Sequence, residues 1–269
     1  MKTNKKWKLP KISISKRQIF VLVTAFLTSG LIVTQVLESE SRFLVVGILA
    51  IAAYFLTAFA LREDLSGIEW ITLLVLPAMY TLAVGLFYFL LPVRWITRLP
   101  VATLYAIGMY ALLLTENIYN VAAIRTIQLL RAAHAVGFLI TLVTAFLLFQ
   151  SLFSFHLAYW GIFFGVFIIS LPLVFQALWA VKLEEGITEP VAIYSFSIAL
   201  ILSEIALMLS FWPLNISLYT LFLIGMFYAL LGVGQQYLTG RLFKKTILEF
   251  FVVPVIVFLI LLISTKWGT

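Results

Sequence analysis

Stretches of about 20 uncharged, mostly apolar residues recur along this chain from near its beginning to near its end. A helix of that length crosses the roughly 30 Å hydrocarbon core of a bilayer. Apolar residues make up 64% of the sequence and charged residues 11%, which leaves little polar chain for a soluble domain. The pattern predicts an all-α fold, a polytopic bundle of transmembrane helices. The strands of a β-barrel would instead alternate apolar and polar residues over about 10 positions.

We expect nine membrane spans, with an eight-span alternative in which the short fourth segment does not cross. A basic cytoplasmic tail (1–18) is expected to precede a single transmembrane domain (19–269). The first apolar run is expected to stay as an anchor, because a polar stretch and not a small-residue cleavage site follows it. The predicted spans are 19–37, 43–61, 68–91, 100–114, 132–152, 157–181, 191–211, 216–237 and 247–264.

Basic residues are concentrated at the start of the chain, where residues 1–18 contain seven cations and no acid. With a cytoplasmic N-terminus, nine spans place 14 of the 18 lysines and arginines on the inside. This asymmetry follows the positive-inside rule and predicts an external C-terminus. The basic tail is expected to rest on anionic lipid headgroups, and nucleic-acid binding is not expected.

The sequence contains no recognisable catalytic motif. It has no cysteine, which excludes disulfides and thiolate metal ligands. Its two histidines, His134 and His156, are predicted on opposite sides of the membrane, so no metal site is expected. Group transfer and hydrolysis need a positioned nucleophile, an acid–base pair or a metal. We therefore expect no cofactor and favour a non-enzymatic role.

One carboxyl group lies inside an otherwise uncharged span. Glu204 falls near the middle of the seventh span, where an ionised carboxyl costs roughly 2.5–3.5 kcal/mol. It is a candidate ligand-binding group of a proton- or cation-coupled transporter, with Gln150 and His156 as candidate partners. The alternative is a neutral carboxyl that only joins two helices by a hydrogen bond.

A second polar cluster is expected on the cytoplasmic side, between the fourth and fifth spans. The chain is predicted to reverse at Asn117 and Asn120, with the next helix starting near Val121. Arginine and histidine side chains there suit an anionic lipid headgroup. The alternative is an interfacial turn whose cations reach the headgroups and set topology. The candidate residues are Arg125, Gln128, Arg131, His134 and Gln176.

Two loops share a pattern of residues. Residues 62–69 and 182–189 each contain a cation, two acids, a Gly-Ile pair and a further glutamate, and a new span follows each. Because the loops lie four spans apart, they are expected on the same side of the membrane. We interpret them as traces of a parallel duplication of spans one to four and five to eight, with the ninth span added. The alternative is a chance similarity of short loops.

The last third of the chain resembles a group of uncharacterised bacterial multi-pass membrane proteins. The resemblance rests on residues 204–206, 211–215 and 240–245. It implies a bacterial cytoplasmic membrane and no particular activity. Three function classes remain: a small-molecule or ion transporter, which we rank first, an assembly or structural subunit, and a lipid-binding or lipid-modifying protein. A homo-oligomer or a membrane protein partner is compatible with each.

Overall fold

The computed structural model describes residues 15–34, 39–62, 65–92, 95–124, 129–184 and 186–265. In these ranges the chain forms nine helices and no strand, and every helix is long and apolar enough to cross a membrane. The prediction of an all-α polytopic bundle with nine spans is thereby confirmed. The helices are α1 (Lys16–Thr34), α2 (Ser39–Leu61), α3 (Glu69–Tyr88), α4 (Trp95–Ile124), α5 (Leu130–Ser154), α6 (Tyr159–Lys182), α7 (Glu189–Ser210), α8 (Ile216–Leu238) and α9 (Lys244–Ser264).

Local polar contacts fix several helix starts. At α1, the Ser15 N–H donates to Gln18 Oε1 at 2.9 Å while the Gln18 N–H donates to Ser15 Oγ at 3.4 Å, which is a reciprocal capping box. At α3, the Ser66 N–H donates to Glu69 Oε2 at 2.8 Å. The bonds at α1 satisfy backbone donors that the start of a helix leaves without a partner, and the bond at α3 ties the preceding loop to the first residue of the helix.

The fourth helix corrects the sequence prediction of a chain reversal at two asparagines. Helix α4 continues through Asn117 and Asn120 and ends at Ile124, so the reversal lies beyond it. Asn120 is fully buried, and its Nδ2 donates to the Leu61 carbonyl at 3.4 Å. Leu61 is the last residue of α2, and the last carbonyls of a helix lack an intrahelical donor. The asparagine therefore joins two helices, and it does not form a turn.

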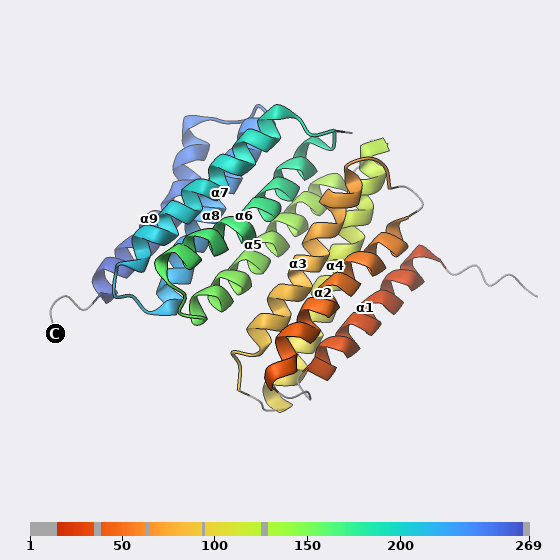
Figure 1. The fold of residues 1–269 in the computed structure, drawn as a ribbon. Coiled ribbons are helices and arrows are strands. Elements are labelled where there is room, and N and C mark those ends of the chain that lie inside the picture. Colours follow the sequence, from red (N-terminus) through yellow and green to blue (C-terminus); the bar gives the residue numbers. More distant parts are fainter. Residues whose placement is uncertain are drawn as a thin grey trace, which may run out of the picture.

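The bundle is built from two similar groups of four helices, shown side by side in Figure 1. Helices α6 and α7 begin 120 residues after α2 and α3, and α5 ends 120 residues after α1. Within the first group, α1 and α3 each pack against α2 and α4; within the second, α5 and α7 each pack against α6 and α8. The equal spacing of α1–α3 and α5–α7, together with the equal neighbours, supports the predicted parallel duplication. We call α1–α4 the first repeat and α5–α8 the second.

The two repeats meet along a boundary formed by four helices. Helix α3 packs against α5 and α6, and α4 packs against α5. Helix α9 makes its extensive contacts with α8, at the far edge of the second repeat (Figure 1). We call the end of the bundle at which α1 begins the proximal end. Successive helices run in opposite directions. The last turns of α4, α6 and α8 and the first turn of α5 therefore also lie at this end (Figure 1).

Candidate functional site

A carboxyl group lies fully buried at the boundary between the repeats. Glu116, on α4 of the first repeat, has an exposed fraction of 0%. Its Oε1 accepts a hydrogen bond of 3.2 Å from Nε2 of Gln176, on α6 of the second repeat, which is 2% exposed. The pair therefore links the repeats directly. Glu116 lies eight residues before the end of α4, or about 12 Å along the helix axis.

Several acceptor oxygens around this pair have no hydrogen-bond donor among the residues that the structure describes. Two belong to the pair itself, Glu116 Oε2 and Gln176 Oε1, and the third is Oδ1 of Asn120, one helical turn after Glu116. Buried polar atoms in proteins are nearly always satisfied by protein or by water, so three open acceptors are unusual. Because all of them are oxygens that accept, the arrangement suits a species that donates or carries positive charge: a proton, a small cation or a water molecule.

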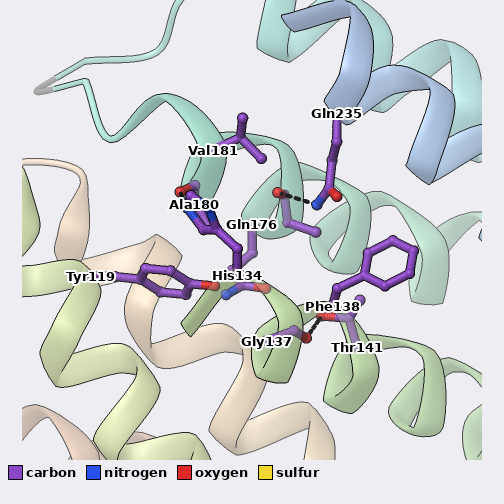
Figure 2. A pocket seen from close by; sticks show the side chains of 10 residues that line it. Tyr119, His134, Gly137, Phe138, Thr141, Gln176, Ala180, Val181 and Gln235 are labelled. Atoms are coloured by element: carbon purple, nitrogen blue, oxygen red, sulfur yellow. Dashed lines mark hydrogen bonds between the residues drawn. The ribbon is translucent and has the colours of Figure 1, made fainter. Parts of the chain in front are cut away.

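A small cavity lies beside Gln176 (Figure 2), and its lining includes residues from the last turns of α4, α6 and α8. Its free space of about 10 Å³ for the centre of a water-sized sphere has room for about one water molecule. The side chains that face it come from α4, α5, α6 and α8. They include Tyr119, His134, Thr141, Gln176 and Gln235.

Hydrogen bonds to helix carbonyls hold the cavity walls in place. Tyr119 Oη donates to the Ala133 carbonyl at 2.9 Å, which joins α4 to α5. His134 Nε2 lies 2.9 Å from the Ala180 carbonyl on α6, and Gln235 Nε2 donates to the Ala177 carbonyl at 3.1 Å. In Figure 2 the Tyr119 ring lies beside the His134 ring, with 5.5 Å between the centroids. Four helices are thus fixed around one water-sized space.

No side-chain cation compensates Glu116 within the described ranges. The ion pairs Lys182–Glu184 and Lys245–Glu249 lie elsewhere. Across the same ranges, no three histidine or acidic side chains come together in a way that could hold a metal ion. The carboxyl of Glu116 is therefore accompanied by neutral groups only. A single negative charge with neutral oxygens around it suits a proton or a monovalent cation.

Comparison with protein families gives a match over almost the whole helical region. A family described as "Protein of unknown function (DUF5656)" matches residues 21–264. The chain belongs to this family. The expected membership of an uncharacterised family is confirmed, and the match extends well beyond the last third of the chain that carried the resemblance. No curated protein and no solved structure matches the chain.

The structure does not assemble the polar group predicted around Glu204. That residue is exposed on α7, and no described residue forms a hydrogen bond with its carboxylate. Gln150 lies in α5, whereas α7 packs against α6 and α8. His156 is exposed beyond the end of α5, where its Nδ1 lies 2.9 Å from the Ser154 carbonyl. The side chain of Glu204 is therefore exposed and separate from the two residues predicted as its partners.

The second predicted cluster is brought together in part. Arg125 and Gln128 lie outside the described residues. Arg131 is exposed in the first turn of α5, while His134 and Gln176 face the same cavity. The amide of Gln176 donates to the carboxyl of Glu116, so it is engaged by an acid and not free for an anionic headgroup.

Sequence reasoning did not select Glu116, Asn120, Tyr119 or Gln235 as site residues. A usable signal was present, because the predicted fourth span (100–114) was shorter than the roughly 20 residues that a crossing needs. Extending that span toward its C-terminus places Glu116 inside the membrane. Asn120 then falls one turn away on the same face of the helix.

Proposed function

We propose that this protein transports a proton or a small monovalent cation across the membrane, with Glu116 as the residue that binds it. The observation that supports this is the burial of Glu116 at the repeat boundary, with one described hydrogen bond and with open acceptors around it. Ionisable residues inside membrane bundles typically mark ion or proton pathways. Repeat boundaries near the middle of the membrane are also where many transporters bind their substrates.

The chemistry follows from the cost of a buried charge. An ionised carboxyl in an apolar interior is unfavourable by several kcal/mol unless a proton, a cation or donors accompany it. At Glu116 the amide of Gln176 supplies one donor. A proton or cation bound at Glu116 Oε2 supplies the remaining stabilisation of the carboxylate charge. Its release leaves that charge with too few partners. Binding and release would therefore shift the balance between arrangements of the two repeats that Glu116 and Gln176 join.

Flux measurements in reconstituted vesicles test the assignment. Purified protein in vesicles carrying a pH-sensitive dye is exposed to a proton gradient, and separately to Na⁺ or K⁺ gradients. Glu116→Gln keeps the shape and hydrogen bonding of the side chain but cannot release a proton or hold a cation. We expect it to reduce flux at least tenfold while the protein remains folded.

Glu249→Gln is the matched control, because Glu249 is an exposed acid of α9 that pairs with Lys245. It is expected to transport like the unmodified protein. Equal flux in all three proteins, or no flux above empty vesicles under any gradient, would contradict the proposal.

We also propose a bacterial cytoplasmic membrane as the location, with the proximal end on the cytoplasmic side. The basic residues of the tail and of the proximal loops support this orientation under the positive-inside rule. The open acceptors and the cavity would then lie nearer the cytoplasm, and the last membrane helix would end outside.

A further inference from the structure

The outer side of α7 carries a stripe of exposed side chains that includes an acid. Ile193, Phe196 and Met208 are exposed on it, and Glu204 lies one turn before Met208. Positions four residues apart lie on one face of a helix, so Glu204 is flanked by apolar groups. We call these four residues the α7 outer face.

The internal repeat shows how unusual this face is. Its counterparts in the first repeat, 120 residues earlier on α3, are Leu73, Leu76, Val84 and Tyr88, and all four are buried. Helix α3 is covered there because it packs against α5 and α6 of the second repeat in addition to α2 and α4. Helix α7 has no extensive contact among the described helices beyond α6 and α8. The face that the first repeat buries against another repeat is therefore open in the second.

Glu204 adds a chemical requirement to this open face. It lies six residues before the end of α7, about 9 Å along the axis, and so within the apolar length of the helix. No described residue bonds to its carboxylate, and lipid tails offer no hydrogen-bond partner. A group of another transmembrane helix at the same depth would satisfy it.

We propose that the α7 outer face binds the α7 outer face of a second copy of this chain, with the two Glu204 side chains hydrogen-bonded to each other. A carboxylic acid both donates and accepts, so it is complementary to a copy of itself. A two-fold axis along the membrane normal brings the same residue of both copies to the same depth. The repeat comparison adds that this face is of a kind that the fold buries elsewhere, since α3 packs against α5 and α6.

Cysteine cross-linking tests the contact, and the natural chain helps because it contains no cysteine. Met208→Cys is introduced and treated in native membranes with a short thiol-specific cross-linker. The matched control is Phe164→Cys on α6, also exposed (56%, against 73% for Met208). We expect a cross-linked dimer for Met208→Cys and little or none for Phe164→Cys. Equal yields, a product with another protein, or no dimer for Met208→Cys would overturn the proposal.

Two variants of Glu204 test its role in the contact. Glu204→Gln keeps a donor and an acceptor and is expected to dimerise like the natural protein. Glu204→Leu removes both, and we expect the dimer association constant, measured by native mass spectrometry in mild detergent, to fall about tenfold. Unchanged dimerisation of the leucine variant would overturn the role of the carboxyl pair. Because the readout is oligomeric state, the result is independent of whether the protein transports ions.

Discussion

At the scale of single residues, the acids Glu116 and Glu204 differ in their surroundings and not in their chemistry. Glu116 is enclosed at the repeat boundary and bonded to Gln176, whereas Glu204 is exposed on α7. An enclosed acid can bind and release a small cation in a defined site. An exposed acid that faces lipid needs a hydrogen-bond partner from another protein surface. This contrast is the basis for assigning ion binding to one and self-association to the other.

Tyr119 and Gly137 form a close contact that we expect to be sensitive to a single added methyl group. A Cβ on Gly137 would lie 2.5 Å from Tyr119 Oη, which bonds to the Ala133 carbonyl. Gly137→Ala should therefore lower stability by about 1–3 kcal/mol, measured by thermal unfolding in detergent.

Tyr119→Phe removes the clashing oxygen, so the alanine variant should cost much less in that background. Gly47→Ala is the matched control, because no atom lies within 4 Å of its added Cβ. We expect it to be neutral or slightly stabilising, since alanine favours helices over glycine. An equal loss from Gly137→Ala with and without the tyrosine hydroxyl would contradict the assigned contact.

At the scale of elements, the length of α4 decides where the site lies. The predicted turn at the asparagines would have left Glu116 at the membrane surface. The 30-residue helix places it inside the bundle instead. Polar side chains such as that of Asn120 are tolerated there because they bond to the free carbonyls at the end of α2.

The continuous helix predicts that Asn120→Cys will not react with a membrane-impermeant maleimide, because position 120 is fully buried. Gly186→Cys, in the exposed connection before α7 with no atom within 4 Å of its Cβ, should react readily from the proximal side. Similar labelling of both positions in folded protein would show that residues near 120 form an accessible loop.

At the scale of the whole molecule, two repeats and one added helix give an odd number of crossings over the described ranges. We therefore expect the two ends of the chain on opposite sides of the membrane. A protease-cleavable tag at the C-terminus should be cut by added protease in cells whose outer envelope is permeable but whose cytoplasmic membrane is intact. The same tag at the N-terminus should be protected until the membrane is opened. Protection of both tags would instead support the eight-span alternative.

The sequence alone determined the fold class and the approximate position of each span. Bilayer thickness sets the length that a membrane-crossing helix needs, and the apolar runs of the sequence have that length. The sequence did not show how each helix is rotated about its own axis. In a soluble protein an apolar stripe marks the buried side of a helix, but lipid is as apolar as the bundle interior, so helices here are apolar on all sides.

Only the tertiary structure decided which polar side chains face inward and which meet. It turned Glu204 toward the outside and Glu116 toward Gln176, which lies 60 residues away on α6. It also showed that His134 and Gln176 share a cavity with Tyr119 and Gln235. The physical reason is that these contacts depend on close packing between helices of different repeats, and no local pattern of residues encodes that packing.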